Sequence, residues 1–267
     1  MFKREQIETA AFRIGYITLV VMLLLPLVII ISTSITESSY LSFPPKEISL
    51  QWYQKFLESD QWLTAMKNSL ITSTGTMLLS TTLGVLAALG VEGSRGKLST
   101  YLVPLVLLPL LIPAVVTAVT LLTFYSKLGI QQSYLGIILA HSLWATPLVF
   151  FIMQSVFARF DWSLRDAGLD LGASRIRAFW EVVLPGVRNG IFASMLIAFI
   201  ISLQEFIMAL FLSGFDTRTV PVLAYISLRE ILDPLVSVVS TVMIGAAVII
   251  VIGASLAIGL NQLSKNL

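Results

Sequence analysis

Six long apolar stretches, separated by polar segments, limit the fold of this chain more than any other feature. They cover residues 12–35, 68–91, 98–125, 131–157, 189–213 and 236–260. Each is long enough to cross a hydrocarbon layer of about 30 Å, for which a helix needs about 20 residues. The mean hydropathy of +0.90 and a charged fraction of 12% exclude an ordinary soluble domain. The sequence therefore predicts an all-α membrane protein, a single domain over residues 1–267 with six transmembrane helices.

Two of the stretches have features of their own. The first is longer than the apolar core of a cleavable signal, which has about 7–15 residues, so we expect a retained helix, although Ser32 to Ser34 could form a weak cleavage site. The third contains Pro104, Pro109 and Pro113. Proline lacks an amide hydrogen and clashes with the preceding turn, so we expect this stretch to be kinked or broken.

The basic residues predict the orientation. Placing the N-terminus in the cytoplasm assigns 11 of the 17 to the inside, namely Lys3, Arg4, Arg13, Arg95, Lys97, Arg159, Arg165, Arg175, Arg177, Arg188 and Lys265. The other six are then outside, namely Lys46, Lys55, Lys67, Lys127, Arg218 and Arg229. Because cytoplasmic loops carry an excess of Lys and Arg, both termini and the loop at 158–188 are expected to be cytoplasmic.

Composition also bears on chemistry. The chain has no cysteine and one histidine, so a disulfide framework or a metal centre built by this chain is not expected. The sequence has no glycine-rich phosphate loop, so any nucleotide is expected to bind another chain. A membrane-embedded enzyme would need a nucleophile, a base and a metal at one depth, for which His141 and Glu205 are too few. A secondary transporter would predict internal repeats and more intramembrane carboxylates, and we find neither.

The polar loop at 158–188 contains two short helical patterns. Leu164, Ala167, Gly168 and Leu171 have the spacing of one helix face, and the same spacing recurs in Ile176, Phe179, Trp180 and Val183. Gly172 lies between the two patterns, where a left-handed residue ends a helix. We therefore expect two amphipathic helices joined by a glycine hinge, forming a docking surface for a cytoplasmic partner.

The order of residues in this loop carries a resemblance to a known family. The residues concerned are Asp166, Ala167, Gly168, Gly172, Val183, Leu184 and Pro185. They resemble the EAA loop of bacterial ATP-binding-cassette (ABC) importer permeases, in which Glu-Ala-Ala is followed by Gly and by a hydrophobic-Leu-Pro ending. Asp replaces Glu and Gly replaces the second Ala, which keeps an acid followed by small residues.

The resemblance extends over about residues 12–260 and is greatest to the spermidine/putrescine branch. The residues that carry it are Phe43, Pro44, Pro45, Gln51, Trp52, Tyr53, Asn68, Ser69, Leu70, His141, Pro147, Ser202, Leu203, Gln204, Glu205, Phe206, Asp233 and Pro234. It implies a type I ABC importer (MetI-like) permease fold with a cytoplasmic coupling helix, in the bacterial inner membrane.

The resemblance implies half of a translocation pathway for a small charged organic solute such as a polyamine. Other branches carry aminoalkyl phosphonates or opines, so the solute stays open. The implied partners are a second homologous permease, two cytoplasmic ATPase subunits that hold ATP and Mg²⁺, and a periplasmic binding protein. This chain itself would hold no cofactor and catalyse no reaction. The residues expected to couple it to the ATPase are Leu164, Asp166, Ala167, Gly168, Leu171, Gly172 and Ala173.

Three residues have alternative interpretations. Asp166 could instead close a capping box with Ser163 at the start of a helix. Glu205 is the one acid within the predicted spans and, with Ser202 and Gln204, could line the path of a cationic solute. Alternatively, it could pair with a loop arginine such as Arg218. His141 is expected to be neutral and hydrogen-bonded to a neighbouring helix rather than to relay protons.

Two further expectations concern packing. Gly84, Gly90, Gly190 and Gly253 are expected to let neighbouring helices approach closely. In the outer segment at 36–66, apolar residues at 52, 53, 56 and 57 predict a short helix at the membrane interface. That segment either rests on the membrane or docks a solute-delivery protein.

Overall fold

The computed structural model describes residues 2–93, 99–230 and 233–263, and Arg95, Lys97 and Lys265 lie outside them. Within these ranges the chain is helical and has no strand, apart from an isolated bridge between Thr36 and Ile48. The all-α fold class is confirmed. The chain divides into two compact units, Met1–Leu63 with Ala224–Val248, and Thr64–Leu223 with Ile249–Leu267, which we describe separately.

The first unit contains α1 (Phe2–Ser34), α2 (Gln51–Glu58), most of α11 (Val220–Glu230) and the first half of α12 (Leu235–Leu263). The Thr33 hydroxyl donates to Ser237 Oγ at 3.0 Å, and the hydroxyls of Ser34 and Tyr53 lie 2.9 Å apart. The predicted short helix in the outer segment is confirmed as α2, which buries Trp52 and Phe56.

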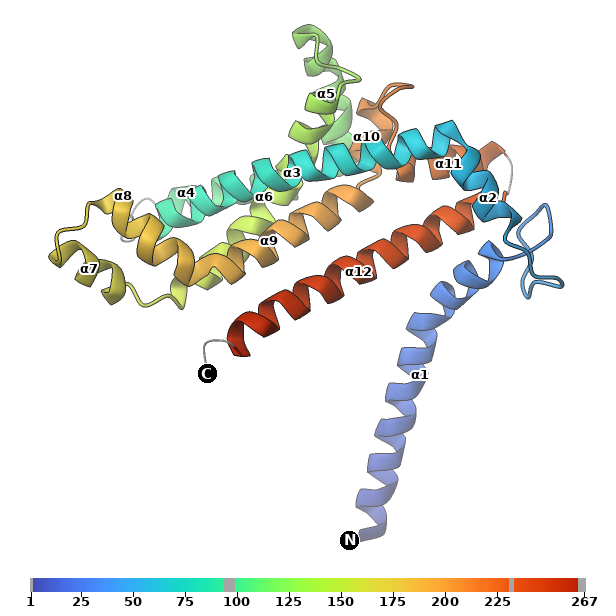
Figure 1. Ribbon diagram of the computed structural model, residues 1–267, viewed down its shortest axis with the longest axis horizontal. Coiled ribbons are helices and arrows are strands. Elements are labelled where there is room, and N and C mark those ends of the chain that lie inside the picture. The colour runs from blue at the N-terminus through green and yellow to red at the C-terminus, as the bar shows by residue number, and fades with distance from the viewer. Residues whose placement is uncertain (1, 94–98, 231–232, 264–267) are drawn as a thin grey trace. The chain divides into compact units, whose positions relative to one another are not determined.

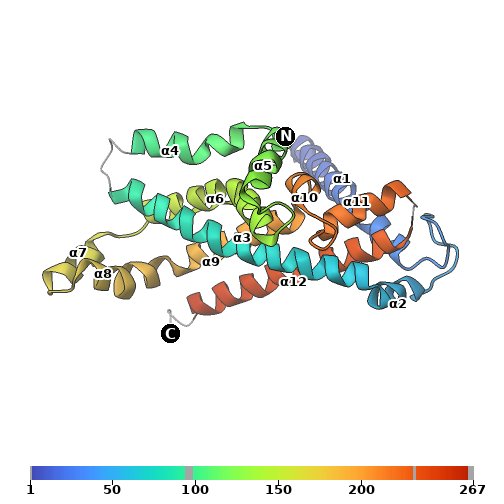
Figure 2. The ribbon, with the colours of Figure 1, turned by 90° about the horizontal axis from the view of Figure 1, so that it is seen from above.

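The second unit is built around α6 (Tyr134–Ala158), which packs along α9 (Leu184–Gln204), as Figures 1 and 2 show. Most of α3 (Asp60–Gly93) also belongs to this unit. Buried residues of α3, α6, α9 and the turn before α9 form one apolar cluster: Ala88, Ala145, Val149, Phe150, Met153, Phe157, Val183, Val187 and Ala198. This cluster holds α3, α6 and α9 together at the end of the unit where the polar loop begins.

The third apolar stretch is broken, as its prolines predicted. It forms α4 (Ser99–Leu107), the 3₁₀ turn η1 (Leu108–Leu111) and α5 (Ala114–Leu128). The two halves meet at an angle of 94°. Pro113 precedes α5 and cannot donate a backbone hydrogen bond, and Ile112 is extended, so the helix restarts in a new direction.

The fifth stretch differs from the prediction. A continuous helix over 189–213 was expected, but α9 already begins at Leu184 and ends at Gln204, and a separate short helix, α10, covers Ile207–Leu212. Glu205 is extended at the break. Among the described residues, five helices are long and apolar enough to cross a membrane, or six if the bent pair forms one span.

The four glycines expected at close helix contacts divide into two pairs. A Cβ atom on Gly84 would lie 2.6 Å from Val149 Cγ1 and 3.0 Å from the Phe150 backbone nitrogen, and one on Gly190 would meet Val156 at 2.5 Å. For Gly90 and Gly253 no atom of a neighbouring element lies within 4 Å of such a position, so the expectation was wrong for them as far as the described residues go. Of these four glycines, Gly84 and Gly190 are therefore the two that α6 approaches closely.

We expect Gly84→Ala to lower the thermal stability of the purified protein, whereas Gly90→Ala on the same helix should not. The new methyl group of Gly84→Ala would meet backbone of α6, and overpacking of this kind costs about 1–3 kcal/mol. At Gly90 the methyl group enters open space, and alanine has a higher helix propensity than glycine. Thermal unfolding in detergent measures the difference. Equal midpoints for the two variants would contradict the close contact.

Candidate functional site

The polar loop forms two short helices, α7 (Ser163–Asp170) and α8 (Arg175–Ala178), followed by the π-helical turn η2 (Phe179–Val183) that leads into α9. Both views place α7 and α8 together at one end of the second unit, beyond the start of α9 (Figures 1 and 2). The loop is thus attached directly to a long apolar helix, and a displacement of the loop would be passed to α9.

The start of α7 differs from the capping box considered above. Asp161 Oδ1 accepts hydrogen bonds from the backbone amide of Ser163 at 3.0 Å and from its hydroxyl at 2.7 Å. These bonds hold the pKa of the Asp161 carboxyl below its usual value. Asp166 instead pairs with its neighbour Arg165 at 2.6 Å and is exposed. The capping box was therefore wrong, and the Asp166 carboxylate is not used to cap α7.

Gly172 interrupts the two helices as predicted. Its φ is +88°, in the left-handed region that favours glycine. The Gly172 amide donates to the Leu169 carbonyl at 2.9 Å, and the Ala173 amide donates to the Gly168 carbonyl at 3.1 Å, which closes α7. The Ser174 side chain then accepts from the Arg177 amide and begins α8. The expected break is confirmed, with both adjacent helix ends satisfied.

Because of this backbone conformation, Gly172→Val is expected to loosen the loop more than Ala173→Val. A left-handed residue with a Cβ costs about 1–2 kcal/mol, and a β-branched side chain is the worst case. Hydrogen–deuterium exchange over residues 163–183 should therefore be faster in the Gly172 variant. Slower or equal exchange relative to Ala173→Val would show that the turn adopts another conformation in solution.

The residues expected to dock a partner are mostly exposed. Leu171 is 90% exposed and Leu164 is 54% exposed, and Asp166, Ala167 and Gly172 are exposed as well. Gly168 is half-buried, and a Cβ atom there would lie 3.7 Å from Val182, so this glycine packs within the loop itself. Ala173 is also half-buried.

The second helical pattern is divided between interior and surface. Val183 is buried and Phe179 packs against the apolar cluster, whereas Ile176 and Trp180 are 74% and 62% exposed. The four residues therefore do not form one face, because the π-helical turn changes the angle between successive side chains. The loop still exposes large apolar side chains on both sides of Gly172.

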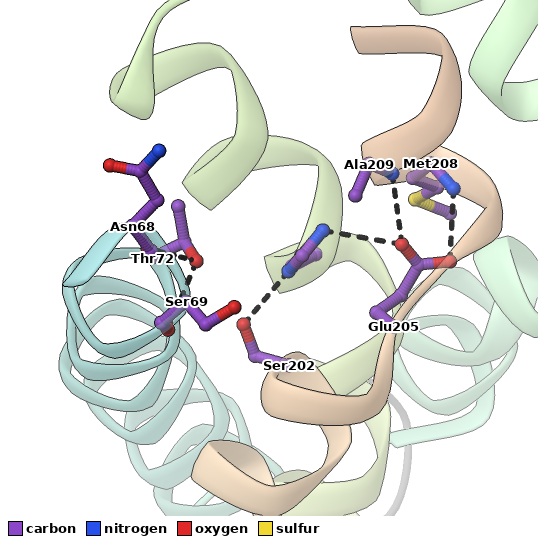
Figure 3. A network of polar contacts seen from close by, with 8 residues as sticks. Asn68, Ser69, Thr72, Ser202, Glu205, Met208 and Ala209 are labelled. Atoms are coloured by element: carbon purple, nitrogen blue, oxygen red, sulfur yellow. Dashed lines mark hydrogen bonds and ion pairs between the residues drawn. The ribbon is translucent and has the colours of Figure 1, made fainter. Parts of the chain in front are cut away.

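A second polar group occupies the break between α9 and α10 (Figure 3). Glu205 accepts hydrogen bonds from the backbone amides of Met208 and Ala209, each at 3.0 Å, and caps the N-terminus of α10. Its Oε2 atom lies 3.2 Å from His141 Nε2, and His141 Nδ1 lies 2.8 Å from the Ser202 hydroxyl. His141 thus joins α6 to α9 by a hydrogen bond, as expected.

These contacts change the interpretation of Glu205. Its side chain is 13% exposed and is directed to α10 and His141, and Arg218 instead stacks on the ring of Phe215 at 4.9 Å. Ser202 is buried and Gln204 is exposed. The geometry supports a positioning role for Glu205, and a role of these three residues in a solute path stays a prediction. Sequence alone missed the cap because the apolar stretch continues through the break.

Comparison with known proteins identifies the family. The profile of the family described as "Binding-protein-dependent transport system inner membrane component" matches residues 80–266. The chain is 29% identical over 209 residues to the putrescine transport system permease protein PotI of Escherichia coli (strain K12), covering 76% of this chain and 74% of that one.

Two further relatives have different names. The chain is 26% identical over 231 residues to the spermidine/putrescine transport system permease protein PotC of Haemophilus influenzae, covering 86% and 89% of the two chains. It is 34% identical over 214 residues to the molybdenum transport system permease protein ModB of Mycobacterium bovis, covering 73% and 80%.

Solved structures share the fold. A crystal structure of a bacterial ABC transporter involved in the import of the polysaccharide alginate matches with a TM-score of 0.72 at 15% identity, over 95% of this chain and 96% of that one. The alginate transporter in complex with an alginate-bound periplasmic protein matches with a TM-score of 0.74 at 18% identity, over 94% and 93%. Because the family profile covers more than half of its residues, this chain belongs to the binding-protein-dependent transport system inner membrane components, the permease subunits of ABC importers.

Proposed function

We propose that the chain forms half of a solute pathway and is driven by a cytoplasmic ATPase that docks on α7 and α8. The observation that carries the proposal is the exposure of Leu171 and Ile176 on either side of the Gly172 turn, in a loop that continues directly into α9. Exposed apolar side chains of this size are unfavourable in water and are typical of an interface. Basic residues on both sides of the turn support a cytoplasmic location.

The assembly in this proposal has four further subunits. A second homologous permease completes the pathway, two ATPase subunits bind ATP and Mg²⁺, and an extracytoplasmic binding protein delivers the solute. This chain supplies the membrane helices and the α7–α8 loop on which the ATPase docks, and it carries out no covalent chemistry. Closure of the ATPase pair would move the two loops together and switch the helices between inward-open and outward-open states, a two-state coupling between distant sites.

The proposed solute is a polyamine. PotI and PotC, the polyamine permeases among the relatives, support this, and the PotC match covers the larger share of this chain. The molybdenum relative shows that similar chains serve other solutes. Because the Glu205 carboxylate is already bonded to α10 and His141, we assign the selection of the solute to the binding protein.

The experiment that tests this proposal is reconstitution. The chain is co-expressed with its cognate ATPase and second permease, placed in proteoliposomes, and supplied with the cognate binding protein. We expect the ATPase to co-purify, and putrescine or spermidine to stimulate ATP hydrolysis and to enter the vesicles. Stimulation by molybdate or an aminoalkyl phosphonate, and not by a polyamine, would show that the solute is not a polyamine. Purification without any ATPase would overturn the coupling.

A further inference from the structure

At the end of the second unit opposite to α7, a buried asparagine joins three segments. The side chain of Asn68 on α3 is 1% exposed. Its amide nitrogen donates to the backbone carbonyls of Asp216 at 2.8 Å and Arg218 at 2.9 Å, and its oxygen accepts from the Tyr134 hydroxyl of α6 at 2.7 Å. Figure 3 shows Asn68 on α3, beside Ser69 and Thr72. Three of the four hydrogen bonds that an amide can make are thus formed.

The segment that Asn68 holds is the connection between α10 and α11, residues 213–219, which we call the 213–219 loop. Further bonds fix it from two sides. The Val220 amide donates to Ser69 Oγ at 2.8 Å, and the Thr217 hydroxyl donates to the Gln132 carbonyl at 3.1 Å and accepts from the Gly214 amide at 2.8 Å. Two backbone carbonyls of the loop accept hydrogen bonds from one buried side chain, Asn68. The conformation of the loop is therefore fixed from the interior and does not depend on contacts at the surface.

The tip of this loop remains exposed. Phe215 is 75% exposed, and the Arg218 guanidinium lies 4.9 Å from the centre of its ring. Aromatic and arginine side chains are both enriched in protein interfaces relative to the rest of the surface. The backbone carbonyl of the same arginine accepts a hydrogen bond from the buried Asn68 side chain. The position of the Phe215–Arg218 tip is therefore set by α3 and α6.

We infer that Asn68 is a positioning residue that makes the 213–219 loop, α3 and α6 move as one body. In consequence, a partner that displaces the Phe215–Arg218 tip also displaces α3. Under the proposed function, on which this last step rests, the partner is the extracytoplasmic binding protein. Asn68 then transmits the displacement caused by docking of that protein from the 213–219 loop to α3 and α6.

The chain offers a matched pair of variants. Asn68→Asp keeps the oxygen that accepts from Tyr134 and replaces the amide donor by an oxygen facing two carbonyls, so it breaks the loop bonds alone. Tyr134→Phe removes the third bond and keeps both loop bonds. Asn68→Ser removes the donors without adding charge, and it serves if the aspartate variant fails to fold.

Trypsin provides a direct readout, because it cleaves after Arg218 and the carbonyl of that peptide bond is held by Asn68. A protease needs this segment to leave its place and extend. Because both Asn68 variants lose two buried hydrogen bonds to the loop, cleavage at this bond should be about tenfold faster or more in both variants of the assembled transporter. Tyr134→Phe should stay near the parent rate. Parent-like cleavage of the Asn68 variants, or equally fast cleavage of Tyr134→Phe, overturns the inference.

ATP hydrolysis by the reconstituted transporter tests transmission separately. We expect unchanged basal hydrolysis in all variants, and loss of stimulation by the solute-loaded binding protein in both Asn68 variants but not in Tyr134→Phe. Retained stimulation in Asn68→Ser would overturn transmission through Asn68. If the parent transporter itself showed no stimulation, the proposed function would fail, while trypsin cleavage would still decide the role of Asn68 in holding the loop.

Discussion

Leu171→Asn is expected to abolish most solute uptake by the reconstituted transporter while leaving the permease folded in the membrane. Leu171 is 90% exposed beside the Gly172 turn and makes few contacts within the chain, so its loss should not affect stability. Burying a leucine at an interface contributes roughly 2 kcal/mol, which corresponds to about thirtyfold in affinity for the ATPase. Co-purification of the ATPase and binding-protein-dependent uptake measure the effect.

The neighbouring Asp170→Asn provides the matched control, because it introduces the same residue one position earlier and removes no apolar surface. The Asp170→Asn variant should take up solute at the parent rate and should still co-purify with the ATPase. Ile176→Asn, on the other side of the turn, should reproduce the defect, since Ile176 is 74% exposed. Normal uptake and normal ATPase retention in both Leu171→Asn and Ile176→Asn would rule out docking on α7 and α8.

Glu205→Gln is expected to give the second large effect, a loss of uptake together with a loss of stability. Glutamine has one acceptor oxygen, whereas the carboxylate accepts from the amides of Met208 and Ala209 at once and lies beside His141. A helix cap contributes about 0.5–2 kcal/mol, and hydrogen bonds to a charged group are at the stronger end of the range. Thermal unfolding and uptake are measured on the same preparation.

Glu205→Asp separates charge from geometry. It keeps the negative charge but is one methylene shorter, so it should no longer reach both amides of α10. If Glu205 positions α10, the aspartate variant is as defective as the glutamine variant. If its charge attracts a cation along a path, the aspartate variant recovers uptake of the cation. Ser202→Ala removes only the hydroxyl beside His141 and should have a smaller effect than either.

Hydropathy predicted most of the long helices, though not the break in the fifth stretch, because it depends on chain length and apolar content, which the bilayer imposes directly. Gly172 could be predicted for a similar reason, since the left-handed conformation is set by one residue. The bend before Ala114 followed from the prolines. These are properties of single residues or of short windows, and they do not require knowledge of neighbouring helices.

The features that could not be predicted depend on partners distant in sequence. The Glu205 cap requires a break after Gln204, yet the residues that follow the break are apolar and give no signal of it. The division of Ile176 from Phe179 follows from a π-helical turn, which an ideal helical spacing does not include. Asn68 acts on carbonyls more than 140 residues later, so its spacing in α3 carries no information about them.

The bent third stretch has a consequence for biosynthesis. The 15 residues of α5 extend about 22 Å, so α5 is too short to cross the bilayer alone. Buried residues of α5 pack against Met208 and Leu212 of α10. At a ribosomal rate of about 5–20 residues per second, α10 emerges roughly 4–16 s after α5. During that interval a nascent chain holds α5 and α6, whose Ile137 and Ala140 belong to the same cluster, without α10. The apolar surface of α5 is therefore fully covered within this unit only after α10 has been synthesised.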